Sequence, residues 1–322
     1  MAPVKPRVPL KILVLKGGDS SEREVSLSSA GRVAAALVSR GHQVTEADPA
    51  GDPLAVLPAA RAADVVWMAL HGGTGEDGTI QALFDLAGVR YTGSGHLASA
   101  LAMDKDLSKH LFRAAGVPTA DWWMARAGGG EEWRTTEYAA RAAAALGLPI
   151  VVKPSKQGST VGLSIVKATQ SLGPAIQEAF RHDDEVMLET FVPGRELTVG
   201  VLGNWMMPVG EIIPKREIYD YECKYTPGMA EELFPAPIEV AVRDEAQRLT
   251  RLAYEALKLR GCARIDFRLH PNGGLYCLEA NTLPGMTGTS LVPQAAQADG
   301  VSFPELCERI ALDALGSPLE NA

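Results

Sequence analysis

The chain has 322 residues, which at about 150 residues per domain predicts two or three domains. Hydrophobic residues make up 46% of it and charged residues 22%, a balance that excludes a disordered chain and fits a globular protein with a buried core. The net charge of −8 gives no global basic surface, so we expect no nucleic-acid partner. An anionic substrate would have to be bound by local lysines, arginines or metal ions.

The sequence also argues against a membrane or disulfide-bonded protein. No apolar run approaches the roughly 20 residues of a membrane span, and residues 10–15 are too short for the apolar core of a secretory signal. The four cysteines contain no CxxC pair, so neither a zinc site nor a disulfide framework is expected for Cys223, Cys262, Cys277 and Cys307. We expect a reducing, cytoplasmic location and no membrane association.

The first hundred residues alternate between strand and helix patterns. Strands are predicted at 11–16, 43–47 and 64–70, helices at 22–39 and from 79, and a strand-turn at 91–95. Strands and helices that alternate at this spacing indicate a parallel α/β sheet. Ligands of such sheets bind outside the carboxyl ends of the strands, which here fall at 17–22, 71–77 and 92–95.

The rest of the chain mixes both patterns and contains no internal repeat. Helices are predicted at 103–116, 137–146, 240–259 and 303–315, two strands around a glycine loop within 149–166, a strand at 185–189, and a β-rich segment that ends at Pro235. Two further strand-like runs, 263–269 and 275–282, surround a turn.

This last pair of runs forms a predicted hairpin with the clearest chemical signal in the chain. The runs flank Pro-Asn-Gly-Gly at 271–274, a strong turn sequence. Pairing that is symmetric about this turn places Asp266 opposite Glu279 and Arg264 opposite Asn281. On the other face it pairs Ile265 with Ala280, Phe267 with Leu278, and Leu269 with Tyr276.

Opposed carboxylates would destabilise a bare hairpin. A divalent cation would reverse that effect, and Asp266 and Glu279 with the amide oxygen of Asn281 are hard ligands suited to Mg²⁺. A polar face with both carboxylates turned into water is the open alternative, and a bulge in the turn would shift the register by one residue. The loop at 283–287 could turn backbone N–H groups toward an anion beside the metal.

A second loop is suited to phosphate. Residues 155–162 are mostly small, so they leave backbone N–H groups and hydroxyls free, and Lys153 at the preceding strand end supplies a cation. The loop is not a Walker A motif, because no GK[ST] precedes a helix, and an ordinary hairpin loop stays open. Glu189, followed by Phe191 and Val192, could offer a carboxylate, an aromatic face and carbonyl groups to a nucleoside.

Three polar segments could complete a site. Ser-Glu-Arg-Glu at 21–24 matches a capping box with Ser21 as N-cap, and Glu22 could instead face a ligand amine. His71 precedes a glycine-rich loop, where a capping or core histidine is the alternative. The polar, aromatic segment 219–225 fits a mobile lid over a site as well as an edge strand.

Together these segments resemble the D-alanine–D-alanine ligases of the ATP-grasp superfamily over nearly the whole chain. The motifs that carry the resemblance are GGDSSEREVSL (17–27), LHGGTGEDGTIQ (70–81), TGSG…SALAMDK (92–105), VKPSKQGSTVG (152–162), YDYECKY (219–225), ARIDF (263–267) and LEANTLPGMTGTSLVP (278–293). The resemblance implies an α/β ATP-grasp fold in which two α+β lobes, 105–193 and 194–322, sandwich ATP beside an N-terminal parallel α/β lobe at 1–104.

The resemblance also implies the roles of the site residues. The nucleotide is held at its phosphates by Lys105 and Lys153, and at its adenine and ribose by Glu189, Glu196, Phe191 and Val192. Two Mg²⁺ (or Mn²⁺) ions are bound by Asp266, Glu279 and Asn281. The first D-alanine is bound by Glu22 and His71, the oxyanion by Arg264 and the Gly285 amide, and the second substrate's carboxylate and the phosphate by Ser290 and Lys224. A hydrogen-bonded set with Glu22 is completed by Ser159 and Tyr225.

The implied activity is ATP-dependent ligation of two D-alanines through D-alanyl phosphate, for peptidoglycan and cell-wall synthesis. The resemblance also implies a cytoplasmic homodimer, and activation by K⁺ stays open. Relatives that make D-alanyl-D-lactate tend to have Phe where this chain has Tyr225. The alternatives are a D-Ala–D-Lac or D-Ala–D-Ser ligase, another ATP-grasp carboxylate–amine ligase, a carboxylase or phosphotransferase, and a non-catalytic nucleotide-binding module. Thr160 and Cys223 depart from the family pattern.

Overall fold

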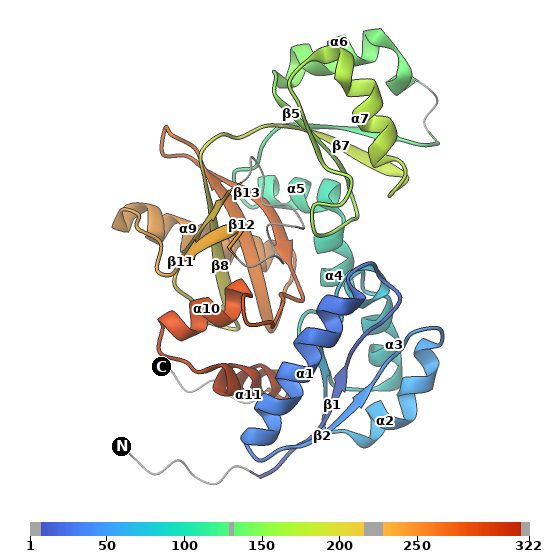
Figure 1. Cartoon of the computed structure of the whole chain (residues 1–322), viewed down its shortest axis with the longest axis vertical. Helices are drawn as coiled ribbons and strands as arrows, with labels where there is room; N and C mark the ends of the chain where they lie inside the picture. The colour runs from blue at the N-terminus through green and yellow to red at the C-terminus, as the bar shows by residue number, and fades with distance from the viewer. Residues whose placement is uncertain (1–7, 129–131, 216–227, 317–322) are drawn as a thin grey trace.

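The computed structural model describes residues 8–128, 132–215 and 228–316, and Figure 1 shows three lobes, each built on its own sheet. The predicted lid segment lies outside the described residues, together with its site residues Lys224 and Tyr225 and with Cys223. The three described cysteines are buried and free. Among the described helices, none has both the length and the apolar character needed to cross a membrane.

The N-terminal lobe contains the predicted parallel sheet, in the order β2-β1-β3. Its elements are β1 (Lys11–Leu15), α1 (Arg23–Ser39), β2 (Gln43–Ala47), η1 (Pro53–Val56), α2 (Leu57–Ala62), β3 (Val65–Met68), η2 (Gly73–Gly75), α3 (Thr79–Ala87) and α4 (His96–Met103). All four residues of β3 are buried, which explains its unbroken apolar sequence. The predicted strand at 91–95 is reduced to one parallel bridge between Tyr91 and Val66.

The central lobe is an antiparallel sheet in the order β4-β7-β5-β6. Helix α5 (Lys105–Ala114) precedes this lobe, whose elements are β4 (Trp122–Arg126), η3 (Glu132–Arg134), α6 (Thr136–Leu146), β5 (Ile150–Pro154), β6 (Ser164–Val166), η4 (Thr169–Ser171), α7 (Leu172–Ala179) and β7 (Glu185–Thr190). The predicted helix at 103–116 begins at Lys105 instead, because the side chain of Asp104 caps it by accepting a hydrogen bond from the Leu107 N–H at 3.1 Å.

The C-terminal lobe has a larger antiparallel sheet in the order β11-β10-β8-β12-β13, with β9 paired to β8. Its elements are β8 (Arg195–Leu202), β9 (Trp205–Met206), β10 (Gly210–Pro214), β11 (Ala230–Leu233), α9 (Val240–Ala256), β12 (Cys262–Leu269), β13 (Leu275–Asn281), α10 (Leu291–Ala298) and α11 (Phe303–Asp313). This sheet carries the predicted hairpin as β12 and β13.

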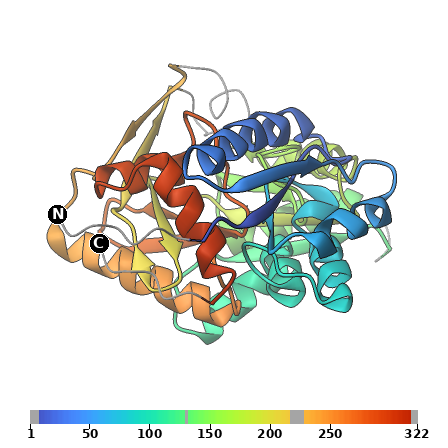
Figure 2. The ribbon, with the colours of Figure 1, turned by 90° about the horizontal axis from the view of Figure 1, so that it is seen from below.

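Two shared cores join the lobes. Helix α11 packs on α1, as Figure 2 shows where red and blue helices lie side by side, and its Leu306 shares a core with Val33 of α1. On the same helix α11, the buried Glu308 carboxylate binds Arg40 at 2.5 Å and His42 at 3.2 Å. Helix α5 packs its Phe112 into the core of the C-terminal sheet. The predicted boundaries between the lobes stay a prediction.

Candidate active site

A cleft of about 1030 Å³ opens between the central and C-terminal sheets. Its apolar lining comes from Val151, Pro154, Val161, Leu163, Phe191, Val192, Ile212 and Leu278. Its charged lining comes from Lys105, Lys153, Glu189, Glu196, Arg264, Asp266, Arg268 and Glu279. Apolar walls with a few convergent charged groups are typical of a nucleotide or cofactor site.

The glycine loop after β5 forms one wall of this cleft. Ser159 and Thr160 have φ angles of 51° and 63°, a left-handed conformation that non-glycine residues seldom adopt and that gathers at functional sites. At the start of the loop, Asp183 accepts a hydrogen bond from the Lys156 N–H at 2.6 Å. At its far side, the Ser159 hydroxyl donates to the Glu22 carboxylate of the N-terminal lobe. The loop therefore spans from one lobe to another.

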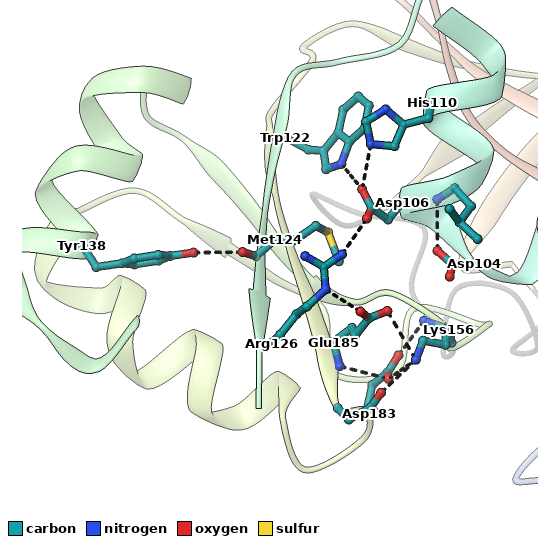
Figure 3. A network of polar contacts seen from close by, with 12 residues as sticks. Asp104, Asp106, His110, Trp122, Met124, Arg126, Tyr138, Lys156, Asp183 and Glu185 are labelled. Carbon is teal, nitrogen blue, oxygen red and sulfur yellow. Dashed lines mark hydrogen bonds and ion pairs between the residues drawn. The ribbon is translucent and has the colours of Figure 1, made fainter. Parts of the chain in front are cut away.

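A polar network ties the base of this loop to α5 (Figure 3). Lys156 lies 3.3 Å from Glu185, which accepts a hydrogen bond from Arg126 at 2.6 Å. Arg126 also binds Asp106 at 3.0 Å, and Asp106 accepts from the Trp122 indole at 2.7 Å. Exposed ion pairs are individually weak, but this series fixes the first turn of α5, which carries Lys105, relative to the loop.

A buried carboxylate lies between two lysines beside the cleft. One oxygen of Glu189 binds Lys153 at 2.7 Å, and the other binds Lys109. Burial alone raises the pKa of Glu189, but the two ammonium charges more than offset this effect and lower the pKa to about 2. Lys109 was not predicted from the sequence, although Lys109 lies one helical turn after Lys105, which was the available signal.

The predicted hairpin register is confirmed at the polar end of β12 and β13. Asp266 lies opposite Glu279, and Arg264 lies opposite Asn281. Asp266 is only 6% exposed, and its oxygens accept hydrogen bonds from Arg264 at 2.8 and 2.9 Å and from Thr198 at 2.7 Å. The Glu279 side chain is 28% exposed and lies 3.3 Å from the Lys105 ammonium. Neighbouring cations thus compensate both opposed carboxylates.

The predicted pairing of Phe267 with Leu278 and of Leu269 with Tyr276 is wrong. The register shifts between Asp266 and Phe267, so that Phe267 lies opposite Cys277. This bulge lets Cys277 stay in the core with Phe267 while Leu278 and its neighbour Glu279 both line the cleft. An extra residue that redirects side chains at a site is a common use of a β-bulge. The bulge lies beside the site and not in the turn.

A second, more polar pocket of about 670 Å³ adjoins the cleft at the N-terminal lobe. Its lining includes Glu22, His71, Glu76, Asn281, Leu283, Pro284, Gly285, Thr287, Thr289 and Ser290. Four residues line both spaces: Gly158, Ser159, Arg264 and Glu279. The two spaces therefore meet at Arg264 and Glu279. Every predicted site residue in the described part of the chain lines at least one of them.

The N-terminal lobe contributes three polar residues to this pocket. The predicted capping box is wrong, because Glu22 and not Ser21 is the N-cap of α1, and no side-chain cap bond is formed. The Glu22 side chain turns to Ser159 instead. His71 lies 3.7 Å from Glu76, and burial raises the pKa of Glu76. The sequence analysis did not single out Glu76, although it lies in the glycine-rich motif.

The loop after β13 closes the pocket from the C-terminal lobe. Ser290, the N-cap of α10, accepts a hydrogen bond from the Thr287 N–H at 2.9 Å and contacts the Thr287 hydroxyl at 2.8 Å. A Cβ atom on Gly285 would lie 2.8 Å from the Ser290 hydroxyl, so only glycine fits there without a shift. Gly285 and Arg264 thus line the same pocket, with the loop tied at Thr287 to Ser290.

Two α+β lobes that face each other across a cleft with charged and apolar lining, joined to a parallel α/β lobe, define the class: the chain is an ATP-grasp enzyme. Solved structures agree. A D-alanine–D-alanine ligase from Bacillus anthracis complexed with ATP is 29% identical, with a TM-score of 0.83 over 95% of this chain and 98% of that one. A second structure of the Bacillus anthracis ligase is 31% identical, with a TM-score of 0.84 over 95% of this chain and 98% of that one.

Sequence comparisons give the family. The family models for the D-ala D-ala ligase C-terminus and N-terminus match residues 111–311 and 44–94. D-alanine–D-alanine ligases from Syntrophotalea carbinolica and Pelobacter propionicus are both 46% identical, over 93% and 94% of this chain and 94% and 96% of theirs. The chain belongs to the D-alanine–D-alanine ligase family, a family of ATP-dependent ligases.

Proposed function

We propose that this chain joins two D-alanine molecules into D-alanyl-D-alanine, with ATP converted to ADP and phosphate. One observation carries the proposal: the larger cleft and the smaller polar pocket meet at Arg264 and Glu279. A carboxylate bound in the smaller pocket would there face the terminal phosphate of a nucleotide in the larger one. The relatives named as D-alanine–D-alanine ligases, and the related structure complexed with ATP, support this assignment.

The nucleotide site in this proposal uses the charged and apolar lining of the cleft. Lys105 and Lys153 bind the phosphates, and the Lys105 ammonium is already held by the Gln157 carbonyl at 2.8 Å. Adenine and ribose are bound where Glu189, Phe191, Val192 and Glu196 line the cleft. Glu196 lies 3.4 Å from Arg268, which fixes its carboxylate beside the nucleotide.

The donor set beside the phosphates fits a magnesium site. Mg²⁺ takes hard oxygen ligands, and in nucleotide enzymes it uses one or two carboxylates together with phosphate oxygens. Asp266, Glu279 and Asn281 supply two carboxylates and an amide oxygen. Within the described ranges, no group of three or more His, Cys, Asp or Glu residues is placed to hold a metal without such an amide or a phosphate. We propose that these residues hold two Mg²⁺ or Mn²⁺ ions, which would neutralise phosphate charge when bound.

The first chemical step activates one D-alanine. Glu22, with His71 beside it, binds the ammonium group, and the Ser159 hydroxyl holds Glu22 by a hydrogen bond. The family resemblance adds Tyr225, outside the described residues, to this set. A carboxylate oxygen of the substrate attacks the γ-phosphorus of ATP, the bond to ADP breaks, and D-alanyl phosphate forms. Lys105 and Lys153 stabilise the charge on the transferred phosphoryl group.

The second step forms the peptide bond. The amine of the second D-alanine attacks the acyl carbon and loses a proton, and phosphate leaves. Arg264 and the backbone N–H of Gly285 stabilise the tetrahedral oxyanion. Ser290 and Lys224 bind the carboxylate of the second substrate and the phosphate. Water must be excluded, because an acyl phosphate hydrolyses readily.

Product identification tests the proposal. The protein is incubated with ATP, Mg²⁺ and a panel of D-amino and D-hydroxy acids, and the products are identified by mass. We expect D-alanyl-D-alanine, with phosphate release that requires a D-amino acid. A depsipeptide, D-alanyl-D-serine or ATP turnover without a D-amino acid would each refute the assignment.

Two further properties belong to the same proposal. We propose a homodimer, tested by sedimentation against the 34.2 kDa mass of one chain, and a cytoplasmic location. Initial rates in K⁺ and Na⁺ buffers test for activation by K⁺.

A further inference from the structure

Lys109 is a charged residue where a charge is costly. Its side chain is 0% exposed, and fully buried lysines are rare unless they are paired. It lies on α5, which Figure 1 shows between the central lobe and the C-terminal sheet, one turn after Lys105. Lys105 lines the cleft, whereas Lys109 does not. Lys109 can therefore affect a nucleotide in the cleft only through its neighbours.

The first neighbour is Glu189, which Lys109 shares with Lys153. Each lysine binds a different oxygen of the same carboxylate. The cluster holds two ammonium groups and one carboxylate, so it keeps one excess positive charge beside the cleft. Burial lowers the pKa of the Lys109 ammonium below its usual value; the charge of Glu189 opposes this shift, and the charge of Lys153 adds to it. Such an excess charge is stabilised when an anion binds in the cleft.

The second neighbour is Thr119, which connects the cluster to the C-terminal sheet. The Lys109 ammonium donates to the Thr119 hydroxyl at 2.5 Å, and this hydroxyl donates to the Cys277 carbonyl at 2.8 Å. Cys277 lies on β13, two residues before Glu279. Lys109 thus joins the strand that carries Lys153 to the strand that carries Glu279 through a buried chain of hydrogen bonds.

We propose that Lys109 is a positioning residue that sets the affinity of the cleft for nucleotide phosphates. It neutralises one oxygen of Glu189, so Lys153 keeps a net positive charge toward the cleft. Without Lys109, the buried carboxylate and Lys153 would form a neutral pair, and the excess charge would be lost. The inference rests on the proposed function in one respect, the placement of phosphates at Lys153.

The test measures ATP binding and steady-state kinetics in charge variants of this cluster. In Lys109→Met, which removes the charge and is one heavy atom shorter, we expect the Kd and KM for ATP to rise about ten- to hundredfold. The kcat and the KM for D-alanine should change less than about threefold. Lys11→Met, at an exposed lysine of the N-terminal lobe, is the matched control and should match the wild type.

The double variant Lys109→Met/Glu189→Gln restores the excess charge through Lys153 alone. It should bind ATP more tightly than Lys109→Met, which a purely structural role for Lys109 does not predict. Unchanged ATP affinity in folded Lys109→Met, or no recovery in the double variant, would overturn the proposal. If Lys109→Met does not fold, the double variant is compared with Glu189→Gln, in which Lys109 has no carboxylate to neutralise. The two should then bind ATP with similar affinity, and a further tenfold loss in the double variant would overturn the proposal.

Titration with ATP in the absence of D-alanine separates this inference from the proposed function. Loss of nucleotide affinity in Lys109→Met supports the positioning role even if no dipeptide forms. Normal dipeptide formation with unchanged nucleotide affinity refutes the positioning role alone.

Discussion

The carboxylate of Glu279 is the sharpest single test of the proposed chemistry. Its role as a metal ligand predicts that Glu279→Gln loses at least about a thousandfold in turnover. A neutral amide cannot replace the negative charge of the carboxylate at the metal. The structure also predicts a small effect on stability, and this pair of outcomes separates a functional carboxylate from a structural one.

The size of the stability effect follows from the neighbours of Glu279. At 3.3 Å from Lys105 the two charges attract by about 5 kcal/mol at an effective dielectric constant of 20. The Glu279 side chain is 28% exposed, so solvent screening leaves about 1 kcal/mol. Removing the charge also relieves repulsion from Asp266 on the opposite strand, which offsets part of this loss. The net change should stay within about 1 kcal/mol.

The assay compares Glu279→Gln with Glu231→Gln, an exposed glutamate of the same sheet. Phosphate release at varied Mg²⁺ gives turnover and metal dependence, and thermal unfolding gives stability. We expect a melting temperature within about 3 °C of the wild type for both variants, with turnover lost only in Glu279→Gln. Near-normal turnover with unchanged Mg²⁺ dependence would remove Glu279 from the metal site.

Three further predictions address other parts of the site. Gly285→Ala forces a Cβ to within 2.8 Å of the Ser290 hydroxyl, so kcat should fall about tenfold, whereas Gly173→Ala, where the added Cβ has open space, should be neutral. Tyr225→Phe should gain depsipeptide formation when D-lactate competes with D-alanine; an unchanged product ratio measured by mass would contradict the specificity assignment. The pKa of Glu189 is lowered to about 2 from an unfolded value near 4.5, so its contribution to stability is present above pH 4.5 and is lost as pH falls toward 2. Glu189→Gln should therefore flatten the acid limb of the melting-temperature profile, and an unaltered limb would refute this account.

Local sequence pattern determined much of the architecture. The buried parallel strands were predictable because their apolar residues run without interruption, and the antiparallel hairpin because its turn sequence is distinctive. The pairing of Asp266 with Glu279 followed from counting outward from that turn. It holds because the bulge at Leu278 offsets the one-residue difference in the pairs nearest the turn, such as Leu269 with Leu275.

The bulge at Leu278 depended on tertiary structure. Counting from the turn cannot reveal this bulge, because its cause is packing with distant segments. Cys277 stays in a core shared with α5 and α9, while Leu278 lines the cleft. The capping box at Ser21 failed for a similar reason, since Glu22 makes its hydrogen bond to Ser159, which lies far along the chain in another lobe.

Lys109 marks the limit of what sequence alone determines. The sequence predicts that Lys109 lies on an amphipathic helix, but lysines on such helices are mostly exposed. Only the packing of α5 between two lobes buries the ammonium and supplies Glu189 and Thr119 as partners from distant segments. Sequence periodicity fixes which face of an element is apolar, whereas burial of a charge depends on long-range contacts that bring its counter-charges together.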